Sequence, residues 1–530
     1  MTLLLNIDFF KRHYFKIALA LFIVVHVLLL NINVAEWGDS YRILRASEYV
    51  REGSYPEDEK RPVLFSLMLA LRPSFIDQTT FGRVVLLAFS FASLIIFLRI
   101  VDVFIQDKIL KLFAAIIFIL NPVYLYWSIR IMADIPFGFI VLLAMYLSII
   151  WRDTMNSKKI SVLAFITVLG VMTRFEGYLL FVSIFAGILL SQIPTYNVQE
   201  LVKKISKENM LRAILFAVIF IMLLIPNFLI RNPLSSSYFE ETAGRAYDLK
   251  MLWIYTASLL FIFGFSFAPA LLVSRMKEAI MFLRRYTSLF LFVVAELLLC
   301  LLWPAAIPRL FIPVIPFLIL IFVIELKKFF EEKNEVKSLS VNFLILNVVL
   351  LAFFVVSQYF LKLQFLVLIK PIFISVVFLQ FLVIYSLFLK RRLYVFSAIL
   401  LSIAIWSFST IWIHKDIFIS VKNGAEYAAQ NLSGNVAYND VSSVSDWYIN
   451  YQYKRTDLKG FYYYTEKKSQ LEHSKLLEEN IDYLLITNEH NTTMELDLSS
   501  RPYLEEITEF RYNVNGSEFF TKIVRVKDDM

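Results

Sequence analysis

Cysteine, glycine, histidine and charged residues are all scarce in this 530-residue chain. Its single cysteine, Cys300, excludes an intrachain disulfide and gives no information about the redox compartment. With only 13 glycines the chain has few candidates for nucleotide-cradling loops, and it lacks P-loop, dinucleotide-binding, zinc and Ser-His-Asp signatures. His26 has no second histidine at a metal-ligand spacing. We therefore expect no cofactor and no soluble nucleotide chemistry.

Apolar residues, in contrast, are abundant. Only 18% of the residues are charged, whereas 59% are hydrophobic and 16% aromatic, and the mean hydropathy is +0.66. A soluble globular domain does not have this composition. A bilayer core needs about 20 apolar residues per helix, and such segments recur from Phe15 to Ile413. We predict a polytopic α-helical membrane protein with about thirteen spans, at residues 15–33, 82–105, 110–127, 135–151, 160–173, 177–193, 211–230, 250–273, 286–303, 310–325, 339–358, 371–389 and 393–413.

Lysine and arginine clusters fall in alternate loops, as expected for loops that face the cytoplasm. This pattern places the N-terminus in the cytoplasm, and an odd number of spans places the C-terminal region outside. The net charge of +8 follows from these inner loops, which face anionic lipid, and needs no nucleic acid to explain it. We predict a multi-pass protein of a prokaryotic cell membrane. A cleaved signal peptide is the alternative for the first apolar segment, but this segment is long and the chain continues in the membrane.

The outer loop at residues 34–81 is too polar to cross a bilayer. Residues 40–52 mix apolar and charged side chains as an interfacial helix does, and residues 63–71 form a short apolar piece bracketed by Pro62 and Pro73. We predict two interfacial helices here, within a membrane domain that spans residues 1–413.

Charged and tyrosine-rich sequence replaces the apolar runs after His414. Residues 423–431 and 465–479 are typical of helices, and residues 436–439 and 482–487 of strands. Residues 507–526 predict a hairpin around Asn515-Gly516, because Asn-Gly suits a tight primed turn. We predict a small α/β extracytoplasmic domain at residues 414–530. The sequons at Asn431 and Asn491 lie on its side of the membrane, although such tripeptides often arise by chance.

A carboxylate stands just beyond the first span, in the run Trp37-Gly38-Asp39-Ser40-Tyr41. At the outer water boundary, an enzyme that acts on a lipid-linked substrate would need a base. The alternative is structural, because Asp39 immediately precedes the predicted helix and an Asp there caps free backbone amides.

Two arginines lie beside prolines in predicted outer loops. Arg61 precedes Pro62 at the end of the first loop, and Arg309 lies in a proline-rich mouth before the tenth span. A guanidinium stays charged and donates two parallel hydrogen bonds to a phosphate. Each arginine could instead snorkel to lipid headgroups, and Arg309 could pair with Glu296, which lies deeper in the ninth span.

Further charged residues lie at the entries of other spans. Asp134 stands at the entry of the fourth span, where Pro136 in the first turn also makes a capping role natural. The run Thr173-Arg174-Phe175-Glu176-Gly177 occupies the turn between the fifth and sixth spans. Ionisable residues at such depth are functional candidates, and the alternative for Arg174 and Glu176 is a local structural ion pair.

Together these residues place acids and arginines on one side of the membrane, next to lipid. They are Asp39, Asp134, Glu176, Arg61, Arg174 and Arg309. The set fits transfer of a sugar from a polyprenyl phosphate to an acceptor hydroxyl. The polyprenyl tail needs an apolar groove, the phosphate needs cations, and the acceptor hydroxyl needs a base. A phosphate leaving group is already a weak base, with a second pKa near ~6. One carboxylate can therefore suffice, unlike in glycoside hydrolysis.

The chain resembles the GT-C membrane glycosyltransferases, specifically the family of protein O-mannosyltransferases and lipid A aminoarabinose transferases. The resemblance covers roughly residues 15–325. It rests on the order and predicted side of the Trp37 to Tyr41 run, Arg61-Pro62-Val63-Leu64-Phe65, Asn121-Pro122 followed by Asp134, Gly170 with the Thr173 to Gly177 run, and Arg309-Leu310-Phe311-Ile312-Pro313-Val314-Ile315-Pro316.

This resemblance implies that Asp39 is the catalytic base and that Arg61 binds the donor phosphate. Two departures matter. Some relatives carry adjacent acids at the first site, whereas Ser40 follows Asp39 and the nearest acid is Glu36, which leaves the acceptor class open. The loop also lacks the Asp-x-Asp pair of the metal-dependent branch, so we expect metal-independent transfer.

The sequence therefore predicts a glycosyltransferase, a hexosyl- or pentosyltransferase of the mannosyltransferase-like type. It would move a sugar from a dolichyl or undecaprenyl phosphate to a hydroxyl of a protein, lipid or glycan by inverting displacement. Asp39 is the expected base, and Arg61, Arg309 and Arg174 are the expected phosphate ligands, with Asp134 and Glu176 as supporting acids. A membrane carrier or flippase for a lipid-linked or anionic solute is the rival, although carriers usually hold their charges near mid-membrane. A sensory membrane protein is a third possibility.

Overall fold

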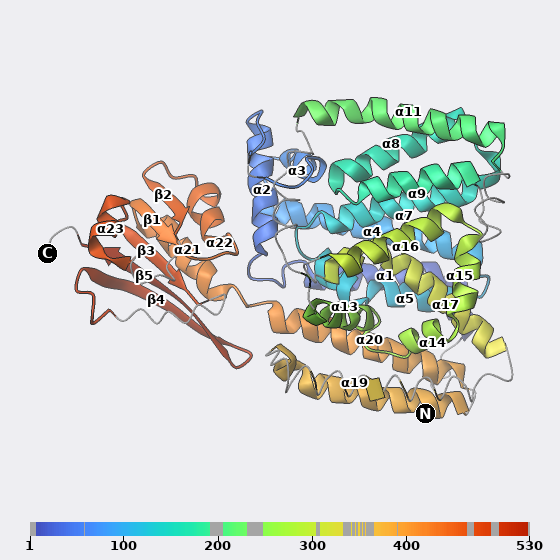
Figure 1. Cartoon of the computed structure of the whole chain (residues 1–530). Helices are drawn as coiled ribbons and strands as arrows, with labels where there is room; N and C mark the ends of the chain where they lie inside the picture. Colours follow the sequence, from blue (N-terminus) through green and yellow to red (C-terminus); the bar gives the residue numbers. More distant parts are fainter. Residues whose placement is uncertain are drawn as a thin grey trace.

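The chain folds into a large helical bundle and a smaller C-terminal α/β domain that stands at one end of it (Figure 1). The computed structural model describes residues 7–57, 59–190, 205–230, 247, 249–303, 308–331, 365–388, 391–463, 471–488 and 498–527, with isolated positions between 341 and 356. The predicted span at 339–358, the sequon at Asn491 and the start of the predicted helix at 465–479 lie largely or wholly outside these residues.

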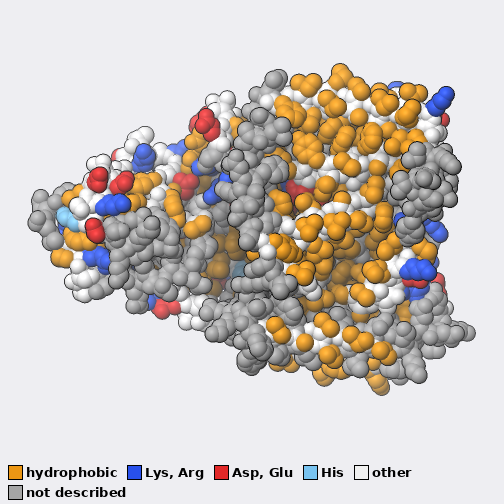
Figure 2. Space-filling model, in the orientation of Figure 1, with side chains coloured by type: hydrophobic (Ala, Val, Ile, Leu, Met, Phe, Trp, Pro, Cys, Tyr) orange, Lys and Arg blue, Asp and Glu red, His pale blue; other side chains and the backbone are white. Residues whose placement is uncertain are grey.

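The bundle consists of helices, most of them long and apolar, and the long ones run roughly parallel or antiparallel to one another (Figure 1). They are α1 (Ile7–Leu29), α4 (Gln78–Phe104), α5 (Lys108–Ile119), α6 (Pro122–Ser128), α7 (Asp134–Trp151), α8 (Ser157–Thr173), α9 (Gly177–Leu190), α11 (Lys207–Ile230), α13 (Leu249–Ile262), α14 (Ala268–Ser274), α15 (Met276–Arg284), α16 (Thr287–Leu302), α17 (Ile315–Glu331), α19 (Phe365–Phe388) and α20 (Arg392–His414). Figure 2 shows a broad hydrophobic band across the bundle, with charged side chains gathered toward its ends. This distribution is that of a multi-pass membrane protein.

Five described helices are long and apolar enough to cross a membrane, and a sixth is added if α5 and α6 form one span. The five begin at Phe9, Gln78, Asp134, Lys207 and Arg392. Shorter apolar helices at Gly177–Leu190, Thr287–Leu302 and Ile374–Ser386 accompany them. The polytopic helical class is therefore confirmed, and the number of thirteen spans stays a prediction.

Two predicted spans are not the continuous helices that we expected. The span at 110–127 bends by 54° between α5 and α6, because Pro122 has no amide hydrogen to donate and its ring opposes a continuing helix. The span at 250–273 breaks between α13 and α14, where Gly264 and Phe265 both have positive φ angles. Asn121 links the two breaks: its side chain accepts from the amides of Val123 and Tyr124, and its Nδ2 donates to Ile262 O at 2.7 Å.

The loop between α1 and α4 contains the two short helices that the sequence predicts. They are α2 (Gly38–Arg51) and α3 (Leu64–Ala70), and α2 lies across the end of the bundle (Figure 1). Helix α2 buries Tyr41, Ile43 and Leu44. We call this end of the bundle the site end, and the other end the far end.

The C-terminal domain is built on a mixed five-stranded sheet with the order β2-β1-β3-β5-β4. Its elements are α21 (Ile419–Asn431), β1 (Gly434–Tyr438), α22 (Val444–Asp446), the π-helix η5 (Trp447–Gln452), β2 (Leu458–Tyr462), α23 (His473–Glu478), β3 (Tyr483–Thr487), β4 (Leu504–Val514) and β5 (Ser517–Val526). The predicted hairpin is confirmed, with antiparallel β4 and β5 joined by Asn515 and Gly516, both at positive φ. The parallel edge strand β2 was not expected from the sequence.

The domain docks on α2 through close contacts. Gly38 lies so near Ser442 that a Cβ on Gly38 would be 2.7 Å from Ser442 O. The ring of Tyr41 stacks on Trp447 at 5.8 Å, and Lys454 Nζ lies 2.6 Å from Glu48 Oε2. These contacts join the C-terminal domain to the helix that carries Asp39.

Gly38→Ala is expected to loosen this docking. The added methyl meets backbone rather than a movable side chain, so the domain or α2 must shift, at a cost of about 1–3 kcal/mol. Thermal unfolding of the purified protein should show a lower Tm, and limited proteolysis should cut faster between α20 and α21. Glu52→Ala, at the exposed C-terminal end of α2, is the control and should leave both measurements unchanged.

Candidate active site

The Asp39 carboxylate lies between two arginines that come from distant parts of the chain. Asp39 Oδ2 accepts from Arg309 Nη2 at 2.6 Å, and its Oδ1 is ion-paired with Arg61 Nη2. Helix α2 begins at Gly38, two residues earlier than predicted, and Trp37 occupies its N-cap with no side-chain cap. The capping explanation for Asp39 is therefore wrong, and its side chain stays 31% exposed.

Each arginine is held by further contacts. Arg61 Nη1 donates to Glu59 Oε1 at 2.9 Å, and the backbone amide of Arg61 donates to the same oxygen. The Glu59 side chain is only 1% exposed, so this carboxylate is built into the loop. Arg309 lies in the 3-10 turn η3 (Pro308–Phe311), with its guanidinium 5.3 Å from the ring of Trp127. Both arginines are thus positioned at Asp39, and neither simply extends toward lipid.

A second charged group, formed by Asp134, Arg174 and Glu176, adjoins the first group of Asp39, Arg61 and Arg309. Arg174 Nη1 donates to Asp134 Oδ1 at 2.6 Å, and Arg174 Nη2 is ion-paired with Glu176. Asp134 lies in the first turn of α7, whose N-cap, Ala133, makes no side-chain cap bond. Arg309 Nε lies 3.9 Å from Asp134 Oδ1 and so connects the two groups. The local Arg174–Glu176 pair is confirmed, but as one part of this network.

Glu296 does not pair with Arg309 as the sequence suggested. Its side chain is buried in α16, and its electrostatic neighbours are Glu176, Arg174 and Asp134. Arg309, in the turn η3, instead bonds Asp39 of α2. The predicted pairing is wrong, since Glu296 neighbours the second charged group.

Two opposing effects set the ionisation of Asp39. Burial alone would raise the pKa of this carboxyl, but the neighbouring guanidinium groups of Arg61 and Arg309 outweigh it and hold the pKa of Asp39 well below its usual range. Asp39 also lies in the first turn of α2, where the helix dipole favours negative charge. The group is therefore ionised at neutral pH and able to accept a proton.

Arg309→Gln should shift the acid side of the pH–activity profile upward. Removing one of the two cations raises the pKa of Asp39, so the carboxylate required for activity is lost at a higher pH as the solution is acidified. The acid limb of kcat/KM, which reports on groups of the free enzyme, tests this shift. An unchanged acid limb in an active variant would mean that Asp39 ionisation does not control the rate.

A small hollow of about 320 Å³ opens beside Arg61. It passes between the first loop and helices α8, α9 and α11, and it is lined by Arg61, Pro62, Val63, Val171, Phe175, Tyr178 and Asn227. Exposed apolar side chains such as Ile225 and Phe228 lie on α11 next to it. Arg61 thus lines a largely apolar groove.

Several neighbours were missed in the sequence. Glu59 precedes Arg61 by two residues, a spacing that puts both on one side of an extended loop, and this signal could have found it. Trp127 and Arg130 follow the Asn121-Pro122 bend, which the proline could have indicated but the hydropathy pattern did not. Arg130 is buried, with its guanidinium 4.6 Å from the ring of Tyr126. Glu36 accepts from Arg83 Nε at 2.8 Å and from the amide of Ile131, so it supports this corner structurally.

Comparisons with known proteins bear on the fold of the chain. No family model and no curated protein matches the sequence. Among solved structures, ArnT from Cupriavidus metallidurans superposes with a TM-score of 0.62, both bound to undecaprenyl phosphate and in the apo state, over 96% of this chain and 97% of that one, at 12% and 11% identity. The oligosaccharyltransferase AglB from Archaeoglobus fulgidus, in complex with an inhibitory peptide and a dolichol-phosphate, gives a TM-score of 0.50 over 96% of this chain and 74% of that one, at 11% identity. The chain therefore has the GT-C fold of these membrane glycosyltransferases, as its sequence resemblance predicts.

Proposed function

We propose that the protein transfers a sugar from a polyprenyl phosphate, dolichyl or undecaprenyl, to a hydroxyl acceptor at the site end of the bundle, which we take to be extracytoplasmic. The observation that carries this proposal is the pairing of the Asp39 carboxylate with Arg61 and Arg309, beside an apolar groove that Arg61 lines. It supplies a base, two phosphate-binding cations and a place for a lipid tail in one location.

In the proposed reaction, Asp39 accepts the proton of the acceptor hydroxyl. The hydroxyl oxygen attacks the anomeric carbon from the face opposite the phosphate, and a new glycosidic bond forms. The bond between the anomeric carbon and the phosphate oxygen breaks, and its electron pair leaves with the polyprenyl phosphate. The configuration at the anomeric carbon is inverted, and the step needs no metal.

Arg61 and Arg309 would change partners during this step. The donor is a phosphodiester with one negative charge, whereas the leaving polyprenyl phosphate gains a second. The guanidinium groups therefore bind the phosphate more strongly as the bond breaks, which is the condition for stabilising a transition state. As they move toward the phosphate they leave Asp39, and its pKa rises toward that of a stronger base.

The second charged group would support the first. Arg174 is already engaged by Asp134 and Glu176, so its part in phosphate binding depends on an exchange of partners like that of Arg61. Asp134 lies within 3.9 Å of Arg309 Nε and would fix the direction of this arginine. We propose Asp134 and Glu176 as positioning residues for Arg309, Arg174 or the acceptor.

The tail of the donor would occupy the groove beside Arg61. Val63, Val171 and Phe175 offer it an apolar wall, and α11 borders it with exposed apolar side chains. The likeness in fold to an ArnT structure bound to undecaprenyl phosphate supports a polyprenyl-linked donor. The nature of the sugar and of the acceptor is left to experiment.

The test uses the full-length protein reconstituted in liposomes with radiolabelled polyprenyl-phosphate sugars and a panel of protein, lipid and glycan acceptors. Label that appears on an acceptor with inverted configuration supports the transferase. Label that crosses the bilayer while still attached to its carrier would contradict it and would favour a flippase.

A further inference from the structure

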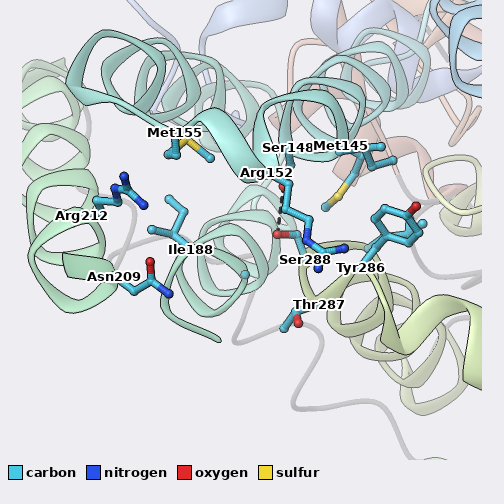
Figure 3. Close-up of a pocket in the computed structure, with 13 residues that line it drawn as sticks. Met145, Ser148, Arg152, Met155, Ile188, Asn209, Arg212, Tyr286, Thr287 and Ser288 are labelled. Carbon is cyan, nitrogen blue, oxygen red and sulfur yellow. Dashed lines mark hydrogen bonds between the residues drawn. The ribbon is translucent and has the colours of Figure 1, made fainter. Parts of the chain in front are cut away.

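A second hollow lies at the far end of the bundle, about 27 Å from Asp134 along the 18 residues of α7. It has a volume of about 530 Å³ and opens where α7 and α9 end and where α11 and α16 begin. Figure 3 shows Asn209 and Arg212 of α11 on one side of it and Arg152 and Tyr286 on the other. The residues placed at Asp39 take no part in this hollow.

Two cations face this hollow from different helices. Arg152, at the end of α7, donates from Nη1 to Arg285 O at 3.0 Å, and its guanidinium stacks 5.8 Å from the ring of Tyr286. Arg212 lies one turn into α11 and contacts Glu208 at 2.5 Å, a carboxylate that is 71% exposed. Arg152 Nε also lies 3.8 Å from Asp153 Oδ1. A guanidinium carries five N–H groups, so either arginine can serve more than one acceptor.

The start of α16 adds neutral donors. Tyr286 is its N-cap, and no side chain caps the first turn, so free amides and the positive end of the helix dipole lie at the lining of the hollow. Thr287, the first helical residue, is 1% exposed, and its Oγ1 has no hydrogen-bond partner among the described residues. A buried hydroxyl without a partner is costly unless a ligand or water supplies one.

The helices below are packed without a gap. Ser148 of α7 donates to Ser288 Oγ at 3.0 Å (Figure 3), and Gly187 of α9 approaches so closely that a Cβ on it would be 1.8 Å from that oxygen. Polar residues share the lining of the hollow with apolar ones such as Met145, Ile149 and Ile188.

We infer that this hollow binds the phosphate headgroup of an anionic membrane lipid. Two guanidinium groups, an uncapped helix start and an unpartnered hydroxyl form a site for a phosphate. The site lies at the rim of the hydrophobic band, and on α11 the apolar residues Leu211 and Ile214, which adjoin Arg212, are exposed as lipid-facing residues are. An acyl chain can run along this surface while its phosphate sits between Arg152 and Arg212.

The test measures lipid binding to the purified full-length protein without any sugar donor, so that its result is independent of transferase activity. Native mass spectrometry from mixed micelles compares phosphatidylglycerol with phosphatidylcholine, and a parallel titration uses inorganic phosphate. We expect phosphatidylglycerol to bind about tenfold more tightly than phosphatidylcholine. Arg152→Gln combined with Arg212→Gln should remove this preference.

Thr287→Val keeps the shape of the side chain and should weaken phosphatidylglycerol binding about threefold, without the loss of folding that an arginine change could cause. Lys158→Gln removes an exposed cation at the start of α8, outside the lining, and should leave binding unchanged. Equal binding of the two lipids, or a preference that survives the double arginine variant, overturns the inference. Inorganic phosphate that binds as tightly as phosphatidylglycerol would also overturn it, in favour of a soluble phosphate ligand.

Discussion

Asp39→Asn is expected to lower kcat for sugar transfer by about 10²- to 10⁴-fold, the range associated with loss of a general base. The amide keeps the size of the side chain but cannot take the acceptor proton at neutral pH. Asp39 touches Arg61 and Arg309, and these arginines have their own contacts to Glu59, Asp134 and Trp127. The local structure should therefore persist in the variant.

Donor binding is the informative second measurement. In the native protein the Asp39 carboxylate competes with the donor phosphate for the same two guanidinium groups. The amide competes less, so the affinity for a polyprenyl-phosphate sugar should be equal or higher in Asp39→Asn. Loss of turnover together with undiminished donor binding would separate a catalytic role from a structural one.

Glu52→Gln provides the control, because it neutralises an exposed acid just beyond the same helix. Its turnover should match that of the native protein. Native turnover in a folded Asp39→Asn variant would refute the assignment of the base. A fall in turnover accompanied by a clear fall in Tm would instead indicate a structural role for the Asp39 ion pairs.

The sequence allowed the elements around the site to be predicted because they follow local rules. Alternation of apolar and charged residues identified α2, the flanking prolines delimited α3, and Asn515-Gly516 identified the hairpin of β4 and β5. The bend at Pro122 and the break at Gly264 were missed because hydropathy averages over a window and does not register a change of direction. The edge strand β2 was missed because it depends on parallel pairing with β1, a long-range contact.

The candidate site shows the same division. Asp39, Arg61 and Arg309 could be selected because each is an ionisable residue at the entry or exit of an apolar segment. Their convergence could only be postulated, since 270 positions separate Asp39 from Arg309. The partner chosen for Arg309, Glu296, was wrong because Arg309, in the turn η3, bonds Asp39 instead, and no local pattern encodes the direction of a short 3-10 turn.

Arg61→Gln is expected to reduce transfer by about 10²- to 10³-fold, the usual effect of removing one donor that stabilises developing negative charge. The donor should also bind more weakly, because its phosphate loses a charge-assisted partner. Arg61→Lys keeps the charge but not the planar guanidinium fork. Its transfer rate and donor affinity should lie between those of the native protein and those of Arg61→Gln. Transfer rates and donor affinities of the three proteins test this order.

Arg61 also has a structural partner, and the experiment must separate the two roles. Removing the guanidinium leaves the buried Glu59 carboxylate without its cation, and breaking such a pair costs about 3–5 kcal/mol. The double variant Glu59→Gln with Arg61→Gln removes both charges and should recover most of the lost stability. If Arg61 binds the donor phosphate, the double variant stays inactive although it is stable. If activity returns with stability, Arg61 serves only to hold the loop, and the phosphate must be bound elsewhere.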